Sequence, residues 1–184
     1  SYGFKVSEAD PGLYIFNGKT DNIYLMVYVD DILIAARDVA TVIETKRRLQ
    51  TSFEARDLGE AETYLGINIT RDRESRTLKI DQERMIKEIV AKFGQEEAKT
   101  RATPLSTSIK LAKDEGEPLD TACYPYAQLV GSLMYLAVCT RPDISQAVGA
   151  LARYMAQPNC SALAGGQGSA ALSLRHRRLR HYLW

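Results

Sequence analysis

The stretch that most constrains the fold is residues 23–36, IYLMVYVDDILIAA. Seven apolar residues precede a pair of aspartates, and five apolar residues follow it. Short apolar runs rich in valine, isoleucine and tyrosine are typical of strands that are buried on both faces. With only Asp30 and Asp31 between them, the two runs predict a tight β-hairpin that carries both carboxylates at its water-excluding tip.

Two adjacent carboxylates beside buried apolar surface are costly unless a cation compensates their charge. Hard carboxylate oxygens suit Mg²⁺ or Mn²⁺, so the pair predicts a metal site. The alternative is an ordinary turn, since aspartate is a common turn residue. Tight hairpins favour Asn-Gly or Asp-Gly because of their positive φ, however, and a second aspartate is not the choice for turn geometry alone. The functional interpretation is therefore favoured.

The rest of the chain predicts further strands and four helices. Asn17-Gly18 indicates a hairpin turn before the apolar stretch, and antiparallel strands are expected at residues 61–69 and 77–80. Apolar residues at helical spacing predict helices at residues 38–53, 81–94, 126–138 and 142–155. In the first helix the expected inward stripe is Val39, Val42, Ile43, Lys46, Leu49 and Phe53.

Local sequence also predicts how these helices begin, end and pack. Asp38 and Asp81 are expected to cap the first two helices, and Gly94 to end the second. Gly131 is expected to permit close packing of the third helix. Arg141 and Asp143 are expected to pair or to cap around a helix start, which is a structural role.

Charge and cysteine content exclude several classes of protein. Residues 1–160 contain 20 of the 24 basic side chains and all 23 acidic ones, which argues against a generic polyanion binder. The three cysteines lack CxxC spacing, so neither a disulfide framework nor a zinc site is expected. We expect them to be reduced thiols in an intracellular protein. The longest apolar run is far short of the ~20 residues that span a bilayer, and no membrane partner is expected.

Five strings, in this order, carry a family resemblance: FKVSEADPGLYIF, IYLMVYVDDILIAA, DLGEAETYLGINITRD, YAQLVGSLMYLA and TRPDISQAVGALARYMAQP. They cover nearly all of residues 3–158. On these strings the chain resembles the reverse transcriptase of copia-type LTR retrotransposons. The resemblance implies an α+β fold, with an antiparallel polymerase-palm sheet and two packed helices at residues 1–95 and a helical thumb and connection part at residues 96–158.

The resemblance also implies the roles of six residues. Asp30 and Asp31 match the paired catalytic aspartates, which bind Mg²⁺ or Mn²⁺ and support two-metal nucleotidyl transfer. The resemblance implies four substrate-binding residues. Tyr28 and Val29 would lie near the primer end and the incoming nucleotide. Leu65 and Gly66 match positions in the family's hairpin that supports the primer terminus. For Leu65-Gly66-Ile67 a buried strand with a glycine bulge is an equal alternative.

One ligand of the implied metal site is missing from the matched strings. The family's earlier metal-binding aspartate is expected upstream of Ser1, and neither Asp10 nor Asp21 is a candidate for it. The metal site is therefore expected to be incomplete, and the fragment is expected to be inactive alone. For the parent enzyme the implied partners are an RNA or DNA template-primer, deoxynucleoside triphosphates and the integrase and RNase H segments of a polyprotein, in cytoplasmic virus-like particles.

The resemblance ends after Pro158. Family members continue with a His-Trp-containing helix, whereas residues 159–184 are rich in glycine and alanine and then in arginine and histidine. One set of allowed codons for this tail, read one nucleotide later, encodes the family's segment. A frameshift is the resulting hypothesis, and an aberrant, disordered tail is expected. The alternative interpretation of RHRRLRH is a nucleic-acid or localisation patch.

Three functions follow from these features. The first is a fragment of a retrotransposon RNA-directed DNA polymerase. The alternative is a non-enzymatic palm remnant that acts as a nucleic-acid or protein interaction module. An unrelated metal-dependent phosphohydrolase ranks last, because no further acid or histidine cluster accompanies Asp30 and Asp31.

Overall fold

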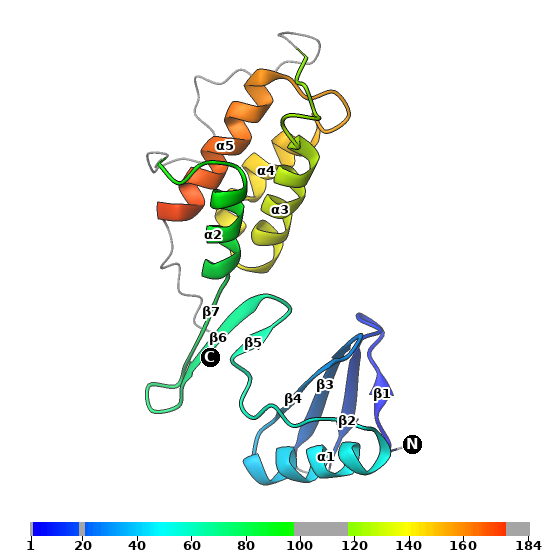
Figure 1. Cartoon of the computed structure of the whole chain (residues 1–184). Helices are drawn as coiled ribbons and strands as arrows, with labels where there is room; N and C mark the ends of the chain where they lie inside the picture. The colour runs from blue at the N-terminus through cyan, green and yellow to red at the C-terminus, as the bar shows by residue number, and fades with distance from the viewer. Residues whose placement is uncertain (1, 19–20, 98–117, 176–184) are drawn as a thin grey trace. The chain divides into compact units, whose positions relative to one another are not determined.

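The computed structural model of the chain describes residues 2–18, 21–97 and 118–175, the last eight of these by their backbone only (Figure 1). The chain divides into two compact units, Ser1–Tyr64 and Leu65–Trp184. Antiparallel strands and helices occur together, as expected for an α+β fold.

The first unit is built on a four-stranded antiparallel sheet in the order β1-β2-β3-β4. Its strands are β1 (Lys5–Val6), β2 (Leu13–Asn17), β3 (Asn22–Tyr28) and β4 (Asp31–Ala36). Helix α1 (Val39–Ser52) follows the sheet directly and packs against β4. The short strand β5 (Thr63–Tyr64) ends this unit. The predicted hairpin of residues 23–36 is thus the centre of the unit.

The apolar stretch is less buried than the sequence predicts. Leu25 is its one buried residue, and Tyr24, Tyr28 and Ile32 are exposed. The prediction of strands buried on both faces is wrong for these residues, because α1 is the only helix that the structure describes in this unit and one helix covers one face of a sheet.

Helix α1 begins as predicted, but fewer of its side chains are buried than the sequence predicts. The Asp38 carboxylate accepts a hydrogen bond from the Thr41 backbone N–H at 2.9 Å, which confirms the cap. Thr45 is buried, and the predicted inward residues Val42, Lys46 and Leu49 are partly buried, whereas Val39, Ile43 and Phe53 are exposed, contrary to prediction. A helix that packs on an edge strand buries only one row of side chains.

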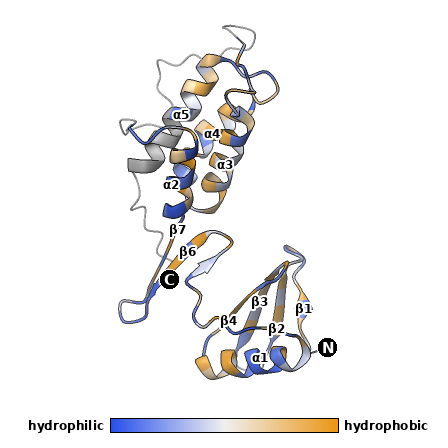
Figure 2. Ribbon diagram, in the orientation of Figure 1, coloured by the Kyte–Doolittle hydropathy of each residue, from blue (hydrophilic) through white to orange (hydrophobic). Residues whose placement is uncertain are grey.

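The second unit begins with a β-hairpin and continues as helices. Strands β6 (Ile67–Asp72) and β7 (Thr77–Asp81) pair antiparallel around the predicted turn. The helices are α2 (Glu83–Lys92), α3 (Tyr126–Cys139), the short 3₁₀ helix η1 (Pro142–Ile144), α4 (Ser145–Ala152) and α5 (Cys160–Arg175). Figure 2 shows apolar residues concentrated where α2, α3 and α4 face one another.

Helix α2 belongs to this helical core and not to the sheet of residues 1–64. Its Ile86, Ile89 and Val90 are buried in one cluster with Leu133 and Leu136 of α3. The structure therefore divides the chain between Tyr64 and Leu65, whereas the sequence predicts a boundary at residue 95. Most of the predicted linker, residues 98–117, lies outside the described residues.

The predicted ends of α2 are close to those observed. The helix begins at Glu83, and the Asp81 carboxylate accepts a hydrogen bond from the Glu83 backbone N–H at 3.2 Å. At the other end Gly94 has a φ of 63°, the left-handed conformation that ends many helices and favours glycine.

Buried polar groups in the second unit have partners. The Thr140 hydroxyl donates to Gln82 Oε1 at 2.7 Å, and both residues are buried. The buried Arg141 donates two hydrogen bonds of 2.8 Å to the two carboxylate oxygens of Asp143. These contacts confirm the predicted structural role of Arg141 and Asp143 at the start of η1.

Two glycines behave differently from each other. Gly131 was expected to permit close packing, but it is exposed and a Cβ built there would meet no atom within 4 Å. The close approach occurs instead at Gly166 of α5, where a Cβ would lie 2.9 Å from Leu129 Cδ2. The helix–helix contact thus depends on a glycine of the tail.

The tail is helical where disorder is expected from its sequence. Residues 160–175 form α5, and Ala162 is fully buried against the other helices. Small side chains let α5 pack closely, which accounts for the difference. The side chain of Arg175 and residues 176–184, which contain the predicted basic patch, lie outside the described residues. Among the helices that are described, none has the length and apolar content to cross a membrane.

Candidate active site

The hairpin loop lies one residue earlier in the chain than predicted. Tyr28 of β3 pairs with Asp31 of β4, so the two-residue loop consists of Val29 and Asp30. Asp30 is a turn residue and Asp31 is the first residue of a strand. Tyr28, Val29, Asp30 and Asp31 are consecutive residues that make up this end of the hairpin.

Val29 has a backbone conformation that β-branched residues rarely adopt. Its φ is 52°, in the left-handed region, and its side chain is 82% exposed. Positive φ at the first loop position of a two-residue hairpin usually selects glycine or asparagine. Strain of this kind is found preferentially at active sites and ligand-binding loops, where surrounding structure maintains it.

The carboxylates of Asp30 and Asp31 are exposed and without a compensating charge. Within the described part of the chain, neither forms an ion pair or a side-chain hydrogen bond. This corrects the prediction of a water-excluding tip. Mg²⁺ usually binds through one or two carboxylates and keeps several waters, so an exposed pair of carboxylates suits it chemically.

The pair is not a complete protein ligand set for a metal ion by itself. In residues 2–18, 21–97 and 118–175, no group of three or more histidine, cysteine, aspartate or glutamate side chains is arranged to hold one. Further ligands for a cation at Asp30 and Asp31 would therefore come from water, from substrate phosphates or from another polypeptide segment.

A turn beside β3 brings a third carboxylate to this end of the sheet. The Val27 backbone N–H donates to the Gly12 carbonyl at 2.8 Å, and the Gly12 N–H donates to Asp10 Oδ1 at 2.8 Å. A Cβ at Gly12 would lie 2.9 Å from the Val27 carbonyl oxygen, so only glycine permits this close approach. The sequence excludes Asp10 as a metal ligand, and the structure holds its carboxylate in a local turn.

Tyr64 is a residue of this site that the sequence interpretation missed. Its hydroxyl oxygen is buried and has no hydrogen-bond partner within residues 2–18, 21–97 and 118–175. Burial raises the pKa of Tyr64, and the nearby charges of Asp31 and Asp10 raise it further. The residue directly precedes Leu65-Gly66 in a family-like string, and this position is the signal that could have drawn attention to it.

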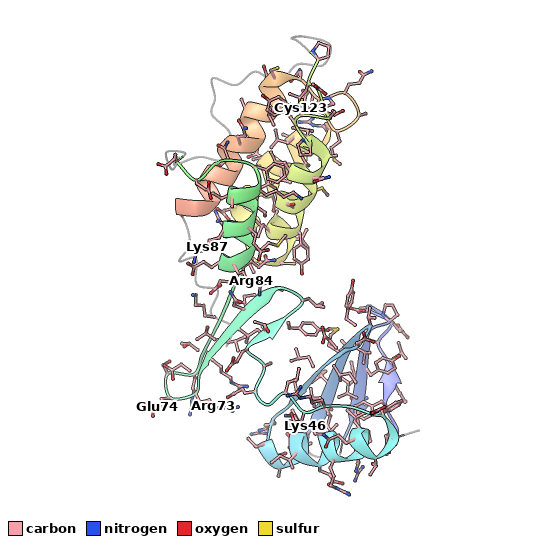
Figure 3. All side chains as sticks on the ribbon, viewed as in Figure 1. Lys46, Arg73, Glu74, Arg84, Lys87 and Cys123 are labelled. Carbon is pink, nitrogen blue, oxygen red and sulfur yellow. The ribbon has the colours of Figure 1, made fainter. Side chains whose placement is uncertain are left out.

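The segment that leads to Tyr64 is tied to α1. Lys46 Nζ donates to Asp57 Oδ1 at 2.6 Å and to the Gly59 carbonyl at 3.2 Å (Figure 3). The hydrogen bond from Lys46 lowers the pKa of Asp57 below its ordinary value. These contacts fix the loop between α1 and β5.

Leu65 and Gly66 form a turn at the start of the second unit. Their φ values are 50° and 76°, the pattern of a two-residue hairpin turn. The Tyr135 hydroxyl of α3 donates a hydrogen bond to the Leu65 carbonyl. The segment is thus a hairpin turn, and the alternative of a buried strand with a glycine bulge does not hold.

Comparisons with known proteins cover the part of the chain that contains this hairpin. The sequence model of the family described as reverse transcriptase (RNA-dependent DNA polymerase) matches residues 1–107. A retrovirus-related Pol polyprotein from transposon TNT 1-94 of Nicotiana tabacum is 40% identical over 156 residues, which cover 82% of this chain and 12% of that protein.

Two further relatives extend the comparison. The retrovirus-related Pol polyprotein from transposon RE2 of Arabidopsis thaliana is 36% identical over 85% of this chain and 10% of its own length. A putative transposon Ty5-1 protein of Saccharomyces cerevisiae is 32% identical over 85% of this chain and 50% of its own length. The chain thus spans from about a tenth to half of these relatives. No solved structure matches it.

Proposed function

Because the chain belongs to the reverse transcriptase (RNA-dependent DNA polymerase) family, we propose that Asp30 and Asp31 bind the catalytic Mg²⁺ or Mn²⁺ of a copia-type polymerase. The observation that carries this proposal is the hairpin tip, where two exposed carboxylates lack a compensating cation among the described residues. An arrangement of this kind gains most from a divalent cation.

Each residue of the hairpin has a task in this proposal. Asp30 and Asp31 supply the carboxylate oxygens, and the β3–β4 pairing places both residues at the tip of the hairpin. Tyr28, which is opposite Asp31, and the exposed Val29 contact the primer end and the incoming nucleotide. When bound, the metal ions supply Lewis-acid activation of the primer 3′ hydroxyl and stabilise the leaving group.

The proposal extends to ligands and partners outside the described residues. Because no group of three ligands occurs within the described residues, we propose that a third carboxylate comes from another segment of the polymerase, and we expect no primer extension by the 184-residue chain alone. The partners of the parent enzyme are a template-primer, deoxynucleoside triphosphates and the integrase and RNase H segments of its polyprotein. Leu65 and Gly66 support the primer terminus through the turn that precedes β6.

A chimera tests the proposal. Residues 1–95 of this chain replace the matching segment of a catalytically competent copia-type reverse transcriptase, and primer extension is measured on an RNA template with Mg²⁺. We expect extension by the chimera and its loss to background in the Asp30→Asn and Asp31→Asn variants. Asp21→Asn is the matched control, because Asp21 directly precedes the opposite end of β3.

Two results would contradict the proposal. Extension by the Asp31→Asn chimera at the level of the Asp21→Asn control would remove Asp31 from the metal site. Templated extension by the unmodified 184-residue chain would contradict the need for a further carboxylate.

A further inference from the structure

Strand β4 has an unpaired outer edge. It is the last strand of the sheet and pairs with β3 on one side, and no group within residues 2–18, 21–97 and 118–175 hydrogen-bonds to the backbone on its other side (Figure 1). The Val27 N–H of β3 donates to the Gly12 carbonyl and so points away from β4. Since backbone groups alternate in direction along a strand, the outward N–H and C=O groups of β4 are those of Ile32, Ile34 and Ala36.

This edge lacks the features that keep a sheet edge from pairing with another chain. Protected edge strands are very short or carry lysine, proline or a bulge. Strand β1, at the opposite edge of the sheet, has two residues and one of them is Lys5. Strand β4 has six residues, DILIAA, and its one charged residue is Asp31 at the start. The outer edge of β4 is therefore a template for a further strand.

Charge complementarity indicates β4 of a second copy as that strand. If a two-fold axis relates two antiparallel β4 strands at Ile34, the residues with outward backbone groups pair with one another, and Asp31 of each copy lies opposite Arg37 of the other. Any other two-fold register shortens the overlap and separates these opposite charges. Arg37 is available for such a contact, because its side chain is 83% exposed and its ion pair with Asp21 is long at 3.6 Å.

Apolar side chains beside this edge are also uncovered. The β3–β4 register places Ile32 on the same face of the sheet as the buried Leu25, yet Ile32 is 41% exposed. Val39 and Ile43 are exposed at the start of α1, which directly follows β4 and packs against it (Figure 2). In a β4–β4 pair, Ile32 of the second copy would lie opposite Ala36, close in sequence to this apolar start of α1.

We propose that β4 pairs antiparallel with β4 of a second copy of this chain, so that two sheets form one continuous sheet. Backbone hydrogen bonds of the outward groups supply the affinity, and the Asp31–Arg37 pairs set the register. Because β1 at the other edge is short and carries Lys5, association ends at the dimer. The pairing requires no metal ion and does not rest on the proposed metal site.

Sedimentation equilibrium of the full chain over a concentration series is the first test. Divalent metal is left out, because Asp31 is also a proposed metal ligand. We expect a monomer–dimer equilibrium. Arg37→Asp places a like charge opposite Asp31 in both pairs and is expected to weaken the dimer about tenfold. Asp21→Asn is the matched control, since it removes the partner of Arg37 within the same chain and is expected not to weaken the dimer.

A mixture of two variants tests the register itself. Arg37→Asp and Asp31→Arg each place like charges opposite one another in their own dimers. One copy of each, however, restores both opposite-charge pairs. We therefore expect each variant alone to be weakened and the equimolar mixture to dimerise with wild-type affinity. A variant that failed to fold would not be rescued by mixing, so rescue separates loss of the contact from loss of the fold.

Hydrogen exchange of the β4 amides locates the interface. The outward amides of Ile32, Ile34 and Ala36 are expected to exchange more slowly as the protein concentration rises. The inward amides of β4 already bond to β3, so their exchange is expected to change less; these are the amides of Asp31, Leu33 and Ala35.

Four results would overturn the inference. They are a monomer at every concentration, species larger than a dimer, a dimer that Arg37→Asp leaves intact, and a mixture that shows no rescue. None of them bears on metal binding by Asp30 and Asp31, which the chimera tests separately.

Discussion

Val29 provides the sharpest test of the hairpin geometry, through its substitution by asparagine. Left-handed backbone costs a residue with a Cβ about 1–2 kcal/mol, and asparagine tolerates it. The side chain is 82% exposed, so less than a fifth of a valine's burial gain of about 1.5–3 kcal/mol is lost, or about 0.4 kcal/mol. Val29→Asn is therefore expected to stabilise the hairpin by about 0.5–1.5 kcal/mol.

Native-state hydrogen exchange of the β3 and β4 amides measures this effect locally. A gain of that size slows exchange about 2- to 10-fold, since 1.4 kcal/mol corresponds to a factor of ten. Val29→Ala is the matched control, because it shortens the side chain but keeps a Cβ at the same φ of 52°. Exchange in Val29→Asn that is no slower than in Val29→Ala would refute the assignment of strain to Val29.

Two further predictions concern the second unit. Burial alone would raise the pKa of Asp81, but hydrogen bonds from Lys79 and Asn68 outweigh it and hold that pKa below its ordinary value. The stability that these hydrogen bonds contribute is present above about pH 3.9, the pKa of an aspartate in the unfolded chain, and it is lost as the pH falls through the lower pKa of Asp81 in the folded chain. The urea midpoints at pH 6 and pH 3 should therefore differ less in Asp81→Asn than in the wild type. Gly131→Ala should raise the free energy of unfolding by about 1 kcal/mol, because a Cβ there meets no atom within 4 Å in an exposed helix interior, and a lower urea midpoint would contradict this.

The sequence predicts local structure in this chain better than it predicts burial. The hairpin, the Asp38 cap and the Arg141–Asp143 pair depend on contacts between residues close in sequence, and all are observed. The packing partner of α2 depends on distant contacts. Apolar residues at helical spacing predict that one face of a helix is buried, but they do not predict whether a sheet or other helices cover that face.

The hairpin loop illustrates the same limit at the site itself. Two aspartates between two apolar runs suggest a loop centred on the pair, whereas the observed pairing of Tyr28 with Asp31 moves the loop back to Val29 and Asp30. No local propensity predicts valine at positive φ. The pairing register of the whole strand imposes it, and register is a property of the sheet.

The buried polar groups of the helical unit have partners, whereas the carboxylates at the hairpin tip of the first unit have none among the described residues, which supports the proposed site. In the helical unit the buried Thr140 hydroxyl donates to Gln82, and Arg141 is matched by Asp143. At the hairpin end of the sheet, strain at Val29 and a pair of carboxylates without a compensating charge among the described residues occur together. Each of these lowers the stability of the isolated chain, and a hairpin with Asn-Gly at its loop would avoid both. Their coincidence at one end is expected where a cation and a substrate complete the structure, because binding then supplies the contacts that folding leaves unmade.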